Sequence, residues 1–161
     1  MTGQNLAMEY KQGNVFKNAA GNFAPVAGIG AGVRNGAAIQ RLTPGVAPGA
    51  RFQGCTLVAK VGAQTGAGTF TLDAKIQTSP DGSTAWADYI PPGQAVVASL
   101  SNGPGLMTVA SSIAELDVDL EGALAFIRVV ETLTVAGGTP TFFPDENVVL
   151  YGADRTPPAG K

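Results

Sequence analysis

The sequence predicts an all-β fold, an antiparallel β-sandwich of about seven or eight strands preceded by an extended, irregular N-terminal arm. Three observations lead to this class. Apolar and polar residues alternate strictly from Phe70 to Gln77, which gives a β-strand one buried and one solvent-facing side. Other short apolar runs are rich in β-branched residues, and glycine and proline separate them. Nowhere does a segment of about ten residues show the three- and four-residue spacing of a helix.

The central element is a hairpin between Thr69 and Tyr89. Its first strand ends at the segment Ser79-Pro80-Asp81-Gly82-Ser83, where proline presets φ, aspartate closes a local hydrogen bond and glycine takes a positive φ. Trp86 and Tyr89 are then expected on the returning strand. Because a lone hairpin is not stable in water, the remaining strands must supply the sheet that covers its apolar side.

The other strands follow in order along the body of the chain. Their expected ranges are Thr56 to Val61, Ala95 to Leu100, Leu106 to Ala110, Glu115 to Glu121, Phe126 to Val135 and Val148 to Tyr151. Leu57, Ala59 and Val61 share the inward side of the first of these, and Leu116, Val118 and Leu120 share that of the fourth. The range from Phe126 is apolar on both sides for part of its length, as a central strand is.

Composition divides the chain into an arm at residues 1–51, a body at residues 52–155 and a tail at residues 156–161. The arm holds five basic residues against one acid, a net charge of +4, whereas residues 52–161 hold five basic residues against eleven acids, a net of −6. An acidic partner surface suits this arm. The expected partner-binding residues are Lys11, Phe16, Lys17, Phe23, Arg34 and Arg41. Because every clearly periodic strand lies after the arm, we expect a body without residues 1–48 to fold.

Bulk composition restricts the function. Only 14% of residues are charged, against about 25% in typical soluble domains, so we expect a homo-oligomer. The net charge of −2 argues against a general nucleic-acid binder. With no histidine and one cysteine, the chain cannot form an intrachain disulfide, a histidine-ligated zinc site, a Ser-His-Asp triad or a Cys-His pair. Cys55 is expected as a buried filler, and neither a signal peptide nor a membrane span is recognisable, so we expect synthesis in a cytoplasm.

Two motifs invite a binding interpretation. The glycines from Gly28 to Gly32 lack the strand and helix that flank a dinucleotide or phosphate loop, so a flexible or closely packed arm is favoured there. The carboxylates of Glu115, Asp117, Asp119 and Glu121 leave one side of a strand about 7 Å apart. A solvated or edge-protecting surface is the leading interpretation, with a calcium site, a glycosidase carboxylate pair and an acidic docking surface as alternatives.

Aromatic and basic residues in the body give weaker signals. Trp86 and Tyr89, with Phe142 and Phe143, are expected in the core, and a sugar-stacking platform is the alternative. Arg128 is expected to pair with Glu131 or with an acid on a neighbouring strand. No constellation defines a catalytic mechanism, a cofactor site or a metal site, so we expect a protein that is not an enzyme.

Two stretches resemble small structural proteins of tailed bacteriophages, in particular capsid decoration or cement proteins of the β-sandwich or jelly-roll kind. The resemblance lies in Phe70 to Asp88, FTLDAKIQTSPDGSTAWAD, and in Val118 to Arg155, where VDLEGALAFIRVVETLTVAGG leads through paired phenylalanines to VVLYGADRTP. Together they cover about a third of the chain. The resemblance implies a jelly-roll-like sandwich without a cofactor.

The same resemblance implies a homotrimer on the outer capsid surface of the virion, with the major capsid protein as partner and without nucleic acid or membrane. There the arm can grip either the shell or a neighbouring subunit. A carbohydrate-binding sandwich of a phage tail or baseplate is the alternative function.

Overall fold

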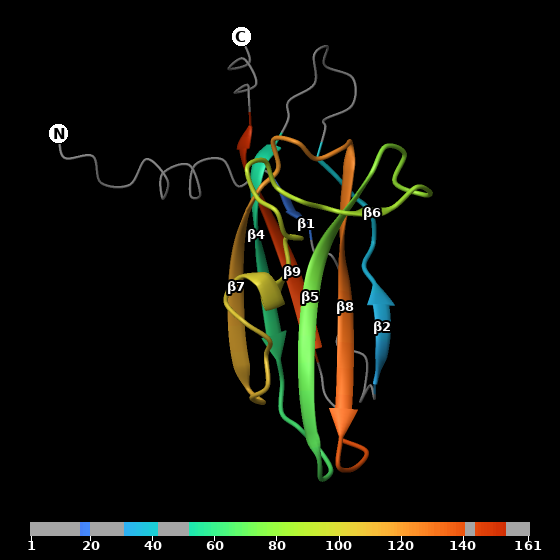
Figure 1. Cartoon of the computed structure of the whole chain (residues 1–161), viewed down its shortest axis with the longest axis vertical. Coiled ribbons are helices and arrows are strands. Elements are labelled where there is room, and N and C mark those ends of the chain that lie inside the picture. Colours follow the sequence, from blue (N-terminus) through green and yellow to red (C-terminus); the bar gives the residue numbers. More distant parts are fainter. Residues whose placement is uncertain (1–16, 20–30, 42–51, 141–143, 154–161) are drawn as a thin grey trace, which may run out of the picture.

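The structure is a computed structural model that describes residues 17–19, 31–41, 52–140 and 144–153, and it consists of two antiparallel sheets (Figure 1). The first sheet has the order β1 (Lys17–Ala19), β9 (Pro144–Ala153), β4 (Phe52–Val61) and β7 (Ser112–Asp119). The second has the order β2 (Gly32–Asn35), β8 (Phe126–Ala136), β5 (Thr69–Ser79) and β6 (Ala87–Asp88). A further two-residue strand, β3 (Ile39–Gln40), also pairs with β8.

The strand pairing is that of a jelly roll. β1 pairs with β9, β2 with β8, β4 with β7 and β5 with β6, and each pair is antiparallel. The first strand thus pairs with the last and the pairing moves inward along the chain, as when one long hairpin is wrapped around a barrel axis. This order confirms the predicted antiparallel β-sandwich of the jelly-roll kind, with nine strands among the described residues.

One core fills the space between the sheets. Phe70, Leu72, Ala74 and Ile76 of β5 are all buried, as their alternation predicts. They meet buried side chains from the other sheet, among them Leu57 of β4, Val118 of β7 and Val148 of β9. β8 is the central strand of its sheet: it pairs with β5 from Ser79 opposite Phe126 to Thr69 opposite Ala136, and with β2 and β3 on its other side.

The segment between β6 and β7 differs from the prediction. The expected strands at Ala95–Leu100 and Leu106–Ala110 are single bridges, at Ser99 opposite Lys75 and at Met107 opposite Leu72. Between them lies a 3-10 helix, η1 (Leu100–Asn102), and the proline and glycines that follow prevent a continuous ladder. The segment still provides hydrogen-bond partners for backbone groups at the edge of β5. The Ile76 N–H donates to the Ala98 carbonyl at 2.9 Å, and the Leu72 N–H donates to the Met107 carbonyl at 2.8 Å.

The expected arm is partly inside the fold. β1, β2 and β3 all precede Phe52, and each pairs with a long strand of the body. Ile39 is 3% exposed and belongs to the core. The boundary expected at residue 52 is therefore wrong for residues 17–19 and 31–41, and the rest of the expected arm lies outside the described residues. No described helix is long and apolar enough to cross a membrane.

Candidate functional site

The residues expected to bind a partner fall into two groups. Lys11, Phe16 and Phe23 lie outside the described residues, and the side chain of Lys17, in β1, does too. Arg34 and Arg41 are both described, and both are used within the fold. Their surroundings differ from those expected of a partner-binding arm.

Arg34 forms an ion pair in the interior of the sandwich. It lies on β2 opposite Glu131 of β8, and its Nε donates to Glu131 Oε1 at 3.1 Å while its Nη2 donates to Oε2. Glu131 is fully buried, and its register partner on β5 is the buried Ala74, so it points inward. The expected pairing of Arg128 with Glu131 is wrong, because residues three apart on a strand lie on opposite faces.

Arg41 holds the start of β4 to the end of β7. Only 2% of the residue is exposed, and its Nη1 donates to the backbone carbonyls of Phe52, at 3.3 Å, and Leu120. The backbone repeats the connection, since the Phe52 N–H donates to the Arg41 carbonyl at 3.2 Å. A cation this deeply buried cannot reach a partner surface, so its expected role as a partner-binding residue is wrong.

The four carboxylates expected on one side of a strand are exposed along and just beyond β7. Asp117 accepts a hydrogen bond from the Thr56 hydroxyl, and Asp119 Oδ1 accepts one from the Glu121 N–H at 2.8 Å. Among the described residues, no three Asp, Glu, Cys or His side chains gather as a metal-binding group. We call Glu115, Asp117, Asp119 and Glu121 the acidic row.

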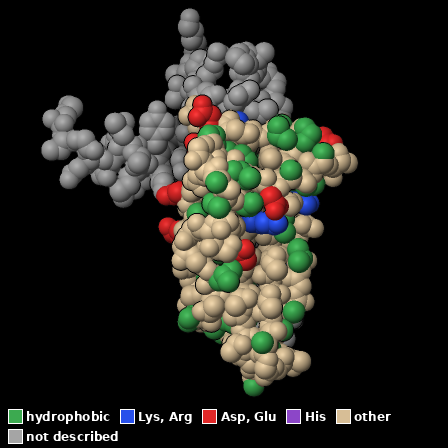
Figure 2. All heavy atoms as spheres, viewed as in Figure 1, with side chains coloured by type: hydrophobic (Ala, Val, Ile, Leu, Met, Phe, Trp, Pro, Cys, Tyr) green, Lys and Arg blue, Asp and Glu red, His purple; other side chains and the backbone are tan. Residues whose placement is uncertain are grey.

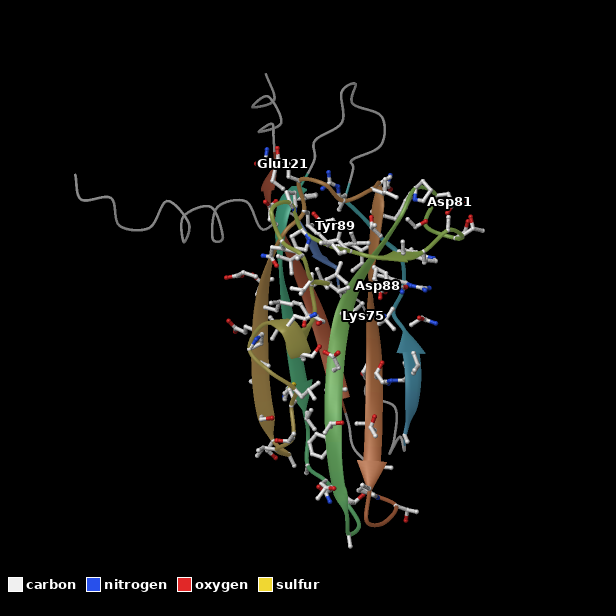
Figure 3. All side chains as sticks on the ribbon, viewed as in Figure 1. Lys75, Asp81, Asp88, Tyr89 and Glu121 are labelled. Carbon is white, nitrogen blue, oxygen red and sulfur yellow. The ribbon has the colours of Figure 1, made fainter. Side chains whose placement is uncertain are left out.

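A second polar group lies on the outer face of the other sheet, and we call it the Trp86 cluster. It consists of Lys75 and Gln77 of β5, Trp86 and Asp88 from the returning segment, and Arg128 of β8. Lys75 and Gln77 are on the opposite side of β5 from the buried alternating residues, so the cluster faces away from the core. Figure 3 shows Lys75 and Asp88 together on this face, and Figure 2 shows basic and acidic atoms side by side there.

The Trp86 cluster is a continuous chain of contacts. Lys75 Nζ donates to Asp88 Oδ2 at 2.8 Å, and Gln77 Nε2 donates to Asp88 Oδ1 at 2.8 Å. Arg128 donates to Gln77 Oε1 from Nε at 2.9 Å and from Nη2 at 2.7 Å. The Arg128 guanidinium carbon lies 4.4 Å from the centroid of the Trp86 ring, a cation–π contact. The five side chains therefore position one another.

Electrostatics within the cluster follow from these contacts. Hydrogen bonds from Lys75 and then Gln77 lower the pKa of Asp88, so its carboxylate is ionised at neutral pH. Desolvation lowers the pKa of Arg128, although an arginine remains protonated. The cluster thus presents two cations, one carboxylate already bonded through both oxygens, and an aromatic ring.

The loop before Trp86 is tightly braced. Asp81 Oδ1 accepts hydrogen bonds from the backbone N–H groups of Ser83 and Thr84 at 2.9 and 2.8 Å. The hydrogen bond from the Thr84 hydroxyl, and then these two backbone bonds, lower the pKa of Asp81. Gly82 has φ +74°, and a Cβ there would lie 2.7 Å from the Phe126 ring. Ala85 has φ +49°, a strained value for a residue with a side chain. The loop therefore holds Trp86 in one place at a conformational cost.

The aromatic residues divide between core and surface. Tyr89 is buried, as expected; its hydroxyl donates to the Asp119 carbonyl at 2.7 Å, and burial raises its pKa. Trp86 is half-buried and lies outside the core, which corrects the expectation that it packs there. Phe142 and Phe143 lie outside the described residues. Cys55 is buried as expected, and burial, with a smaller contribution from Asp117, raises the pKa of its thiol to about 12.

The alternation of polar and apolar residues along the strands already indicated part of the Trp86 cluster. Lys75 and Gln77 on one strand and Arg128 on another are all on the polar side of their strands, as the alternation indicates. Which strands are neighbours, and hence that these side chains meet, depends on the sheet topology. Comparison with protein families, curated proteins and solved structures finds no match to this chain.

Proposed function

We propose that this protein is a non-enzymatic structural protein of a tailed bacteriophage, a capsid decoration or cement protein. In this role it lies on the outer surface of the virion, binds the major capsid protein and stabilises contacts between capsid subunits. It acts as a homo-oligomer, with a trimer proposed from the resemblance described above.

The jelly-roll strand order carries the proposal. Viral capsid domains are among the proteins that use this architecture, which encloses a rigid core and leaves its loops and outer faces for binding. Because one fold hosts many functions, the surface must also support the proposal. Seven large apolar side chains are exposed among the described residues, on a chain in which only 14% of residues are charged. They are Val33, Ile90, Val96, Leu106, Val109, Ile113 and Leu124. Such a surface suits a protein partner.

The test is attachment to capsids that lack decoration. Full-length protein is mixed with undecorated capsids of the phage that encodes it, and bound protein is separated by sedimentation and located by cryo-electron microscopy. We expect saturable binding at a defined set of positions and capsids that disrupt at a higher temperature. Heat-unfolded protein is the control. Folded protein that stays in solution at every ratio contradicts the proposal.

A carbohydrate-binding module of a phage tail or baseplate is the second candidate, because jelly rolls also form lectin domains and the half-buried Trp86 lies in one cluster with Arg128, Gln77 and Asp88. Trp86 is the only tryptophan in the chain, so its fluorescence reports on this site alone. A saturable change in that fluorescence with a glycan favours this candidate. A glycan screen without such a change rejects it.

A further inference from the structure

From the two charged surfaces described above, we infer that the Trp86 cluster is a docking surface for the acidic row of a second copy of this chain. The inference rests on the proposed self-association and names the surfaces that make it. It follows from the hydrogen-bonding capacity of the cluster, from the spacing of its cations, and from the place of the acidic row on the molecule.

The cluster has unused cationic hydrogen-bond donors, whereas its one carboxylate acceptor is already occupied. Among the described residues, Lys75 Nζ makes one hydrogen bond of the three it can donate, and Arg128 Nη1 makes none. Both oxygens of Asp88 are already occupied by Lys75 and Gln77. Asp73, two residues before Lys75, is turned to the Ser101 N–H and hydroxyl, at 3.0 and 2.9 Å. A carboxylate-bearing partner therefore matches the cluster.

The spacing of the two cations matches that of the acidic row. Arg128 lies opposite Gln77, and Lys75 is two residues from Gln77 on the same strand. With a rise of about 3.4 Å per residue and strands about 4.8 Å apart, their Cα atoms are separated by about 8 Å. Carboxylates two apart on a strand are separated by about 7 Å. Glu115 and Asp117 can therefore meet both cations at once, while the Trp86 ring supplies apolar contact area.

The acidic row is accessible at the edge of its sheet. β7 pairs with β4, and no described strand pairs with its other side. In Figure 1 β7 forms the left edge, and Figure 2 shows acidic side chains projecting there. Four carboxylates in one row repel one another, and two cations from a partner relieve that repulsion. The Glu115 side chain is exposed and makes no hydrogen bond to another described residue, so its carboxylate is available.

The two surfaces belong to different sheets and face different directions. Figure 3 shows Lys75 and Asp88 on the viewed face and Glu121, the last residue of the acidic row, at the upper end of the molecule. A two-fold dimer that placed cluster against cluster would bring like charges together. Cluster against acidic row is instead a head-to-tail contact, which closes into a ring when its rotation permits. A ring of three such contacts gives the proposed trimer.

The experiment combines charge reversal with Trp86 fluorescence in the full chain. The acid variant is Glu115→Lys/Asp117→Lys, the cation variant is Lys75→Glu/Arg128→Glu, and the rescue variant carries all four changes. Lys60→Glu, which adds a carboxylate on β4 beside the acidic row and leaves the Trp86 cluster unchanged, is the charge-reversal control of opposite sign. Sedimentation equilibrium at micromolar concentration measures the dissociation constant, and circular dichroism confirms that each variant folds.

We expect the acid and cation variants each to weaken self-association about tenfold or more, the rescue variant to recover most of it, and Lys60→Glu, which makes the acidic surface more acidic, not to weaken it. Wild-type association should weaken with salt and should shift Trp86 emission to shorter wavelength as the ring is covered. The acid variant leaves the Trp86 cluster unchanged. If this variant no longer shows the Trp86 emission shift, the acidic row contacts the Trp86 cluster, and this result holds even if the cation variant does not fold.

Other outcomes overturn the inference, and they separate it from the proposed function. An oligomer that neither variant weakens uses another surface, and a wild-type monomer has no such contact. In both cases attachment to undecorated capsids still tests the proposed function. If the cation variant keeps its oligomeric state but loses capsid attachment, the Trp86 cluster docks on the shell and not on a second copy.

Discussion

Two ion pairs of the same sheet differ in almost every physical respect. Arg34 and Glu131 join β2 to β8 on the inner face, where Glu131 is fully buried, and Lys75 and Asp88 join β5 to β6 on the outer face. In the outer pair the lysine side chain is 31% exposed and the aspartate side chain 38%. Removing one partner of the inner pair leaves an unpaired charge in the interior, whereas water can replace either partner of the outer pair.

The difference shows what the N-terminal segment and the central hairpin each contribute to the fold. The N-terminal segment brings two arginines into the interior and so becomes part of the folding unit. The hairpin keeps its charged residues outside, where they are available to a partner. Charge alone does not distinguish these uses; the face of the strand does.

Removing the N-terminal segment should have the largest effect. A chain without residues 1–41 lacks β1, β2, β3 and the buried Ile39, and it leaves Glu131 without Arg34. Against a typical total stability of about 5–15 kcal/mol, we expect no cooperative unfolding transition. Removal of residues 1–16, which retains every described strand, is the control and should leave a folded protein. A truncated chain that melts like the full chain would falsify the assignment of this segment to the core.

Breaking the inner pair on one side should have the next largest effect. Arg34→Ala leaves a buried carboxylate without its ion pair, and we expect a loss of about 3–5 kcal/mol in urea unfolding. Arg34→Leu/Glu131→Leu removes both charges and should cost less than the single change, because no charge is stranded. A single variant within about 1 kcal/mol of wild type would show that water solvates Glu131.

Strict alternation made the long strands of the fold predictable. β5 and β7 follow it closely, and the apolar stretch of β8 correctly indicated a central strand. The same counting places Glu131 beside Val129 and Leu133 on the inner face, so a buried partner for it was foreseeable. That this partner is Arg34 was not foreseeable, because β2 is only four residues long and too short to show a period.

The Trp86 cluster was less accessible to sequence reasoning. β6 is two residues long, so no pattern fixes the side of the sheet on which Trp86 lies. Its contact with Arg128 depends on β5 and β8 being neighbours, which is a property of the topology. Burial statistics favour the interior for a large aromatic ring, and here a braced loop and a guanidinium hold it at the surface.

Trp86→Ala should therefore cost less than a core substitution. Because the ring is half-buried and its specific contact is one cation–π pair, we expect about 1–2 kcal/mol in urea unfolding. Leu72→Ala, at a fully buried position of β5, is the comparison and should cost about 2–5 kcal/mol. Equal costs at the two positions would place Trp86 in the core after all.

Breaking the outer pair should reduce stability least of all these changes, and the pH dependence of that loss distinguishes it from other small effects. Lys75→Ala should reduce stability by less than about 1 kcal/mol at neutral pH, because both partners are partly solvated. The pKa of Asp88 is lowered in the folded state, chiefly by Lys75, so this contribution is present above the unfolded value of about 3.9. It is lost as the pH falls through the lower folded pKa.

The difference between wild type and Lys75→Ala should therefore shrink on acidification and also in high salt, while Val109→Ala, an exposed change that removes no charge, should show neither trend. The cost of Arg34→Ala should change far less with salt, because the inner pair is shielded from ions. Unfolding curves over a pH and salt series measure all three variants together. A salt response of equal size for the two pairs would contradict the contrast between the inner and outer faces of this sheet.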